Sequence, residues 1–323
     1  MCTAISYKTG DHYFGRNLDL EYSYCETVTI TPRNYVFCFR KKGEMRARFA
    51  MIGMAYVSDG YPLYYDATNE KGLSVAALNF PDNACYNPFC KGKDNITPFE
   101  LIPWILCQCE TVCEAKKLLG QINLLNECYS AKLPLSPLHW IISDKECSMT
   151  LEPLKTGVRV YDNPVGVLTN NPTFDYQLFN LNNYMSLSNS APKNIFLKTK
   201  PNIYSRGMGA LGLAGDYSSM SRFVKATFVK QNSISQSGEV KSVSQFFHIL
   251  NSVEMPRGSV CVGNDLYAVT IYSSCCNTDR GIYYYTTYDN SRITAIDMHK
   301  ENLDQTALIK YPLKTVQSID YQN

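Results

Sequence analysis

The sequence predicts an α+β fold in which sheets pack face to face and helices cover them. Short runs of β-branched and aromatic residues dominate the N-terminal part, helical patterns occur in two groups, and strand patterns return after each group. No Pro/Ser-rich linker, charge run or change of composition divides the chain. We therefore expect residues 1–323 to form a single domain.

The N-terminal part is predicted to form five strands. The turn residues Thr9-Gly10-Asp11 and Asp59-Gly60 separate neighbouring runs, as expected between antiparallel strands. The predicted strands cover residues 2–7, 12–19, 26–32, 48–56 and 73–79.

A helix is predicted to begin after Thr97. Thr97 is a suitable cap, Pro98 suits the first helical position, and Glu100 stands three residues after the cap. A second capping box, Thr111 to Glu114, begins another helix. Further strands are predicted over residues 139–151, 158–169, 266–272, 281–288 and 292–298, and further helices over 174–184, 221–229 and 243–253.

The charge pattern argues against a nucleic-acid partner. The 31 basic and 29 acidic residues are spread along the chain, and the densest basic cluster is the short run from Arg40 to Lys42. No stretch approaches the roughly 20 apolar residues that span a bilayer. Because no secretory signal follows Met1, we expect a cytoplasmic protein, whose 13 cysteines are mostly free thiols packed as small apolar side chains.

Metal and cofactor motifs are missing from the sequence. The four histidines lie far apart, and Cys107 and Cys109 lack a second pair with zinc-like spacing, so we expect buried thiols there. Gly207, Gly209 and Gly212 match G-x-G-x-x-G, but no good strand precedes them and no acid follows at the required spacing. We expect a tight loop there, and neither a metal nor a cofactor in this protein.

Cys2 is the strongest candidate for chemistry. Its small side chain allows removal of Met1, after which its own α-amine, with an ordinary pKa of roughly 7.7 to 8, can accept the thiol proton. Nucleophile and base then share one residue, as in N-terminal threonine enzymes. Taken alone, an N-terminal cysteine is more often an ordinary strand residue.

Arg16 and Asp19 strengthen this hypothesis. Strand alternation sends them to opposite faces, so a local bulge or turn would be needed to bring both charges to Cys2. Asp19 could then hold the amine, and Arg16 could stabilise the thiolate. The alternative is a surface salt bridge, which contributes only about 0 to 1 kcal/mol.

Several blocks together resemble the choloylglycine hydrolases, a family of bile-salt hydrolases and penicillin V acylases. The resemblance spans essentially the whole chain, and its blocks occur in the family's order. They are residues 1–5, 13–19, 69–73, 78–81, 102–104, 138–140, 163–172, 221–223 and 281–285.

This resemblance implies a four-layer αββα N-terminal-nucleophile hydrolase fold, with two antiparallel sheets flanked by helices. It also implies that Cys2 is nucleophile and base, with Arg16 and Asp19 as its partners. Asn79 and Asn170 would supply oxyanion-hole donors, and Arg222 would complete the charged shell.

The implied substrate is a glycine- or taurine-conjugated bile acid, which is cleaved through a thioester. Asn at position 79 resembles the bile-salt branch, since several penicillin V acylases have Tyr there. Amino acids could replace water, which would make amidated bile acids. The sterol pocket is expected from family pocket regions at Leu18, Tyr24, Tyr65, Leu133 and Leu135.

The resemblance also bears on assembly, because relatives are commonly homotetramers and residues 191–212 resemble their long assembly loop. One departure is Ala214, where many relatives have Pro before the Gly; it is expected to loosen this loop without affecting a catalytic role.

Three other functions stay open from the sequence. The same machinery could act on penicillin V or N-acyl homoserine lactones. A papain-like enzyme could use another cysteine with His139 or His248. A protein of the same fold could also bind bile salts without cleaving them.

Overall fold

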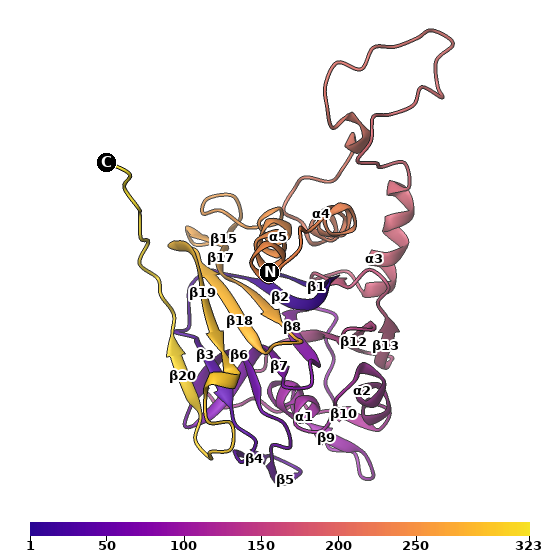
Figure 1. The fold of residues 1–323 in the computed structure, drawn as a ribbon. Helices are drawn as coiled ribbons and strands as arrows, with labels where there is room; N and C mark the ends of the chain where they lie inside the picture. Colours follow the sequence, from indigo (N-terminus) through magenta and orange to yellow (C-terminus); the bar gives the residue numbers. More distant parts are fainter.

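The computed structural model describes residues 1–323 and contains two large antiparallel sheets (Figure 1). Both sheets are fully antiparallel along their strand orders. The six-stranded sheet consists, in order, of β14 (Val167–Leu168), β1 (Cys2–Thr9), β2 (Asp11–Leu20), β17 (Val269–Asn277), β18 (Ile282–Thr287) and β19 (Asn290–Asp297). The eight-stranded sheet consists, in order, of β13 (Gly157–Asp162), β12 (Ser148–Leu154), β11 (Leu138–Ser143), β8 (Ser74–Asn79), β7 (Tyr61–Asn69), β6 (Met51–Ser58), β3 (Thr27–Thr31) and β20 (Ile309–Pro312).

Five α-helices and several small elements complete the chain. The helices are α1 (Leu101–Leu106), α2 (Val112–Leu119), α3 (Phe174–Asn180), α4 (Ser219–Asn232) and α5 (Glu239–Asn251). Small two-stranded sheets are formed by β4 (Val36–Phe39) with β5 (Gly43–Arg46), β9 (Asp94–Ile96) with β10 (Ile122–Leu124), and β15 (Cys261–Gly263) with β16 (Leu266–Tyr267). Short 3-10 turns cover Pro98–Glu100, Leu181–Tyr184, Met208–Ala210 and Met298–Lys300. None of the helices is long and apolar enough to cross a membrane.

Two apolar clusters show that the layers follow the predicted αββα order. One cluster joins the facing sides of the two sheets and continues to the helices α4 and α5, for example through Phe14, Leu78 and Phe246. The other joins the eight-stranded sheet to α1 and α2, for example through Trp140 and Trp104. Burial of these faces is the main force that holds the layers together.

The predicted elements are largely confirmed, with some differences. The turn at Gly10, whose φ is +71°, joins β1 to β2 as expected. The helix after Thr97 begins as a 3-10 turn in which the Glu100 carboxylate accepts from the Thr97 backbone N–H at 3.0 Å, and the α-helix that follows ends at Leu106. The sequence patterns missed β4, β5, β7, β9, β10, β15 and β20.

The glycine-rich segment forms a loop, as predicted. Gly207 and Gly212 have positive φ, and a Cβ on Gly209 would lie 1.9 Å from the carbonyl oxygen of Ser190. The three glycines therefore serve tight turns and a close backbone approach.

The expectation about the cysteines was half right. All 13 are free, and Cys107 and Cys109 are buried as predicted. However, only five of the 13 are buried, and seven are exposed. The exposed ones lie in loops, at helix surfaces and on short edge strands, for example Cys90, Cys113 and Cys261, where no core is available to them.

Stability should depend on pH through His12, which is buried between Ser6 and Thr278. Burial lowers the pKa of His12 to about 4, although Asp279 and Asp144 oppose the shift. Between about pH 4 and 6.5 the unfolded chain therefore binds one proton more than the folded chain. The free energy of unfolding should fall by about 3 kcal/mol as pH decreases through that window. Urea unfolding from pH 4 to 7 should show a steeper pH dependence for the wild type than for His12→Asn.

Candidate active site

The β1–β2 hairpin determines what surrounds Cys2. Cys2 lies opposite Leu18, and Ala4 lies opposite Arg16. Because side chains two residues apart share a face of a strand, Cys2, Leu18 and Arg16 point to the same side. That side faces the other sheet, since Arg16 Nη1 donates to the carbonyl oxygens of Tyr65 (3.0 Å) and Ala77.

Asp19 is held next to the start of the chain by main-chain hydrogen bonds to Met1. Its backbone N–H donates to the Met1 carbonyl oxygen at 2.9 Å, and the Met1 ammonium donates to its carbonyl oxygen at 2.6 Å. The expected bulge or turn is not needed in this segment. Strand β2 is continuous, and the irregularity lies in the facing strand β17, between Thr270 and Tyr272.

Both charged side chains next to Cys2 keep one unpaired polar atom. Arg16 and Asp19 are fully buried. Asp19 Oδ1 accepts from the Thr270 hydroxyl at 2.7 Å, whereas Asp19 Oδ2 and Arg16 Nη2 are buried without a hydrogen-bond partner. A donor and an acceptor are thus both free for further partners next to Cys2.

Asn170 and Arg222 hold the other side of Cys2. Asn170 Oδ1 accepts from the Cys2 backbone N–H at 2.9 Å and from Arg222 Nη2 at 2.7 Å. Arg222 Nη1 also donates to the Cys2 carbonyl oxygen at 2.5 Å and to the Thr3 hydroxyl at 2.7 Å.

The same contacts fix the Asn170 side-chain amide. Since its oxygen faces two donors, its Nδ2 must face the Asn79 carbonyl oxygen, 2.6 Å away. That bond uses one of the two Nδ2 hydrogens and leaves the second free for a ligand.

Charge in the site is balanced among buried groups. Burial lowers the pKa of Arg16, but the neighbouring Cys2, Tyr272 and Asp66 outweigh it and raise that pKa above its ordinary value. Burial lowers the pKa of Arg222, against the effects of Asp19 and Cys2. Burial also raises the pKa of Asp19, although Arg222 and the terminal ammonium oppose this. Two guanidinium groups, those of Arg16 and Arg222, thus lie close to Cys2.

The residues just before α4 are tied to the helix that carries Arg222. Asp216 accepts from the Ser218 backbone N–H at 2.8 Å and from the Ser221 hydroxyl at 2.5 Å. These hydrogen bonds lower the pKa of Asp216 to about 2. Asp216 therefore ties the loop to the first turn of the helix that carries Arg222.

The sequence of this chain matches a known family of hydrolases. The model of the linear amide C–N hydrolases of the choloylglycine hydrolase family matches residues 2–311. The chain belongs to the choloylglycine hydrolase family. It is accordingly an enzyme that hydrolyses a linear amide C–N bond.

Several relatives in this family align over the full length. The chain is 57% identical over 316 residues to a bile salt hydrolase/transferase of Lactiplantibacillus plantarum, with 98% of each protein covered. It is 39% identical over 330 residues to a bile salt hydrolase/transferase of Clostridium perfringens, with 100% of each covered.

Solved structures agree with the fold. The crystal structure of a mutant conjugated bile acid hydrolase from Clostridium perfringens superposes with a TM-score of 0.93 at 37% identity, covering 100% of both chains. A penicillin V acylase from Agrobacterium tumefaciens superposes with a TM-score of 0.75 at 21% identity, covering 97% of this chain and 92% of that one. The second match supports the αββα fold alone.

The structure brings together all six residues predicted as catalytic for this choloylglycine hydrolase, and the five residues predicted for its sterol pocket stay a prediction. Leu18 is buried opposite Cys2, and Tyr65 is half-buried beside Arg16. Tyr24 is exposed, with its hydroxyl 3.2 Å from that of Tyr22. Leu133 and Leu135 are half-buried in the loop before β11.

Sequence reasoning missed several groups that support the site. Asp66 accepts from the hydroxyls of Tyr272 and Tyr283 at 2.7 Å each and balances the buried charge of Arg16. An Asp within an otherwise apolar strand pattern could have indicated this group, because a buried carboxylate needs a charged or hydrogen-bonding partner.

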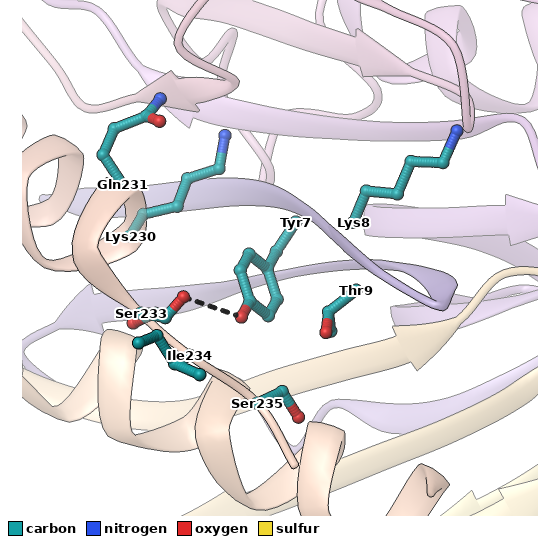
Figure 2. A pocket seen from close by; sticks show the side chains of 8 residues that line it. All are labelled: Tyr7, Lys8, Thr9, Lys230, Gln231, Ser233, Ile234 and Ser235. Carbon is teal, nitrogen blue, oxygen red and sulfur yellow. Dashed lines mark hydrogen bonds between the residues drawn. The ribbon is translucent and has the colours of Figure 1, made fainter. Parts of the chain in front are cut away.

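Neither histidine of the papain-like alternative contacts a cysteine. His139 is buried, with both ring nitrogens engaged by Glu152 and Thr169, and His248 is exposed on α5. A surface pocket of about 500 Å³ lies at the other end of β1, lined by residues that include Tyr7, Lys8 and Lys230 (Figure 2). None of the six catalytic candidates lines it, so it is separate from this site.

Proposed function

We propose that this enzyme hydrolyses glycine- and taurine-conjugated bile acids with Cys2 as its N-terminal nucleophile. The observation that carries the proposal is the set of buried groups that hold Cys2: Asn170 Oδ1 accepts from its backbone N–H, and Arg222 Nη1 donates to its carbonyl oxygen. Beside them, Arg16 Nη2 is a donor without an acceptor, and Asp19 Oδ2 is an acceptor without a donor. Removal of Met1 supplies a terminal ammonium for the carboxylate, and ionisation of the thiol supplies a negative sulfur for the guanidinium.

In the proposed reaction, the Cys2 amine that removal of Met1 frees accepts the thiol proton, and the sulfur attacks the amide carbon as a C–S bond forms. The second Nδ2–H of Asn170 and the backbone N–H of Asn79 receive the negative charge on the carbonyl oxygen. As the C–N bond breaks, the ammonium proton passes to the leaving glycine or taurine. Water, deprotonated by the same amine, cleaves the thioester and restores the thiol.

The substrate class rests on the relatives and on position 79. Relatives aligned over at least 96% of this chain are named bile salt hydrolase/transferase or conjugated bile acid hydrolase. Asn79 matches the bile-salt branch of the resemblance, where several penicillin V acylases have Tyr.

Initial rates with glycocholate, taurocholate and penicillin V test this choice directly. We expect kcat/KM for at least one bile-acid conjugate to exceed that for penicillin V by more than about tenfold, the range that pocket contacts provide. A preference for penicillin V would overturn the substrate class and leave the mechanism intact.

Acyl transfer to amino acids is a second candidate activity, favoured by the word transferase in the names of two relatives. An amine that attacks the thioester in place of water would give an amidated bile acid. Incubation of taurocholate with added amino acids should yield new amidates by mass spectrometry; a product mixture that contains only cholate would exclude the activity.

Asn170→Ala should reduce kcat by about 10²- to 10³-fold, because the variant lacks an oxyanion donor. It also removes the acceptor for the Cys2 amine. Ninhydrin detection of glycine released from glycodeoxycholate measures the effect. Asn171→Ala is the matched control, since the Asn171 side chain donates only to the carbonyl oxygen of Pro81; an equal loss in both variants would argue against the assigned role.

Assembly into a homotetramer remains a prediction for the segment 191–212. The loop between α3 and α4 projects away from the sheets (Figure 1). It exposes Ile195, Phe196 and Tyr204, of which Ile195 is 96% exposed. Apolar surface of this kind is typical of an interface. Light scattering coupled to gel filtration should give four times the 36.6 kDa chain mass.

A further inference from the structure

A buried histidine lies directly behind the two proposed oxyanion donors. His139, on β11, pairs with Leu78, so its neighbour Leu138 lies opposite Asn79. Its side chain is fully buried, as is that of Glu152 on the adjacent strand β12. Neither residue contacts Cys2, and the mechanism above uses neither.

The ring of His139 holds the backbone that presents Asn170. Its Nε2 lies 2.8 Å from the Thr169 carbonyl oxygen, one residue before Asn170. A carbonyl oxygen only accepts hydrogen bonds, so Nε2 carries the proton that makes this contact. The Asn170 backbone N–H donates in turn to the Ser219 hydroxyl at 2.8 Å, so the segment is held on both sides.

Glu152 fixes the orientation of that ring. Its Oε1 lies 3.2 Å from His139 Nδ1 and accepts the Phe174 backbone N–H at 3.0 Å. Glu152 therefore holds Nδ1 while Thr169 holds Nε2, and the ring cannot turn over without losing two buried hydrogen bonds.

The face of the same ring supports Asn79. Phe80, the next residue in the chain, stacks on His139 with ring centroids 4.2 Å apart and an interplanar angle of 7°. One side chain thus touches the residue after Asn79 and the residue before Asn170.

We propose that His139, oriented by Glu152, is a positioning residue that sets the spacing of the Asn79 and Asn170 oxyanion donors. This inference rests on the proposed function, because it assigns His139 a role only if those two residues receive the carbonyl charge. A displacement of about 1 Å in such donors is enough to cost up to about 10²-fold in rate.

Two amide variants separate the two contacts of the ring. Gln at position 139 places a donor where Nε2 stands and keeps the bond to Thr169, whereas Asn places one near Nδ1 and keeps only the contact with Glu152. We expect His139→Asn to lower kcat by about 10- to 100-fold, with KM within about twofold. His139→Gln should retain kcat within about threefold to fivefold of the wild type, because the bond to Thr169 is kept.

Alkylation of Cys2 by iodoacetamide distinguishes positioning from general damage. That reaction displaces iodide from a saturated carbon and forms no oxyanion, so its rate should be the same in the wild type and both variants. Mass spectrometry of the N-terminal peptide measures it. His12→Asn is the matched control, a buried histidine with two hydrogen bonds at the other end of the hairpin; we expect lower stability and unchanged kcat.

Equal kcat values for His139→Asn and His139→Gln, or a parallel fall in alkylation rate, would overturn the inference. If His139→Asn does not accumulate as folded protein, Phe80→Leu tests the stacking contact, with an expected fall in kcat of about threefold to tenfold at an unchanged alkylation rate; wild-type kcat there would count against the proposal. Failure of the proposed function is distinguishable, since Cys2→Ala would then retain activity.

Discussion

Replacing Cys2 with alanine should lower kcat by at least about 10⁴-fold, since loss of the nucleophile in comparable enzymes removes nearly all of the chemistry. The alanine variant should still fold, because Cys2 contributes only a small buried side chain to the core. It should also still bind glycodeoxycholate, with a Kd close to the wild-type KM. Glycine release and isothermal titration calorimetry measure the two quantities.

Cys276→Ala is the control for the loss of a buried thiol. Cys276 lies on β17 in the same sheet, and burial raises its pKa to about 12, so it stays protonated and unreactive at neutral pH. Wild-type kcat is expected for this variant. Activity retained by Cys2→Ala would support an enzyme that uses another cysteine, whereas binding without turnover in the wild type would indicate a carrier of the same fold.

The hairpin that carries the nucleophile was predictable because its information is local. The turn at Gly10 and the runs on either side place Cys2 opposite Leu18, and the alternation of side chains follows from that register. Arg16 and Asp19 were therefore identified from the sequence, although their routes to Cys2 were not. Strand alternation alone places Arg16 and Asp19 on opposite faces. In the structure, the Arg16 side chain reaches the facing sheet, where it donates to Ala77, and the Asp19 backbone donates to Met1 at the start of the chain.

Arg222 and Asn170 could not be predicted from local sequence patterns. Arg222 donates to the carbonyl oxygen of Cys2, 220 positions away, and Asn170 accepts from its backbone N–H across 168 positions. Neither separation has a periodicity that pattern analysis can detect, so only the family resemblance identified these residues. His139 also has distant partners, on β12 and directly after β14, and the resemblance assigned it no role.

The loops predicted to line the sterol pocket were the part of the site that the sequence patterns constrain least. Tyr24, Leu133 and Leu135 lie outside the regular strands, where neither pairing register nor helical periodicity fixes the direction of a side chain. Strand β7 of the eight-stranded sheet was missed because its half-buried positions, Tyr61, Leu63 and Tyr65, are aromatic or apolar and give no alternation with polar residues.

Retention of Met1 should eliminate activity, with kcat lower by at least about 10³-fold, because the amine that acts as the base is then part of a peptide bond. The nitrogen of Cys2 in that bond donates to Asn170, and its lone pair is delocalised into the carbonyl group. It can neither accept the thiol proton nor protonate the leaving amine, and Asp19 Oδ2 keeps no donor.

Expression while methionine aminopeptidase is inhibited to different degrees gives preparations that differ only in the fraction of chains that begin at Cys2. Intact mass gives that fraction, and glycine release gives the specific activity. We expect a straight line through the origin, with activity restored when purified aminopeptidase removes Met1. A substantial intercept at zero removal would mean that another group serves as the base. The unpaired Asp19 Oδ2 would then need a different explanation, because the terminal ammonium would no longer be the group that completes it.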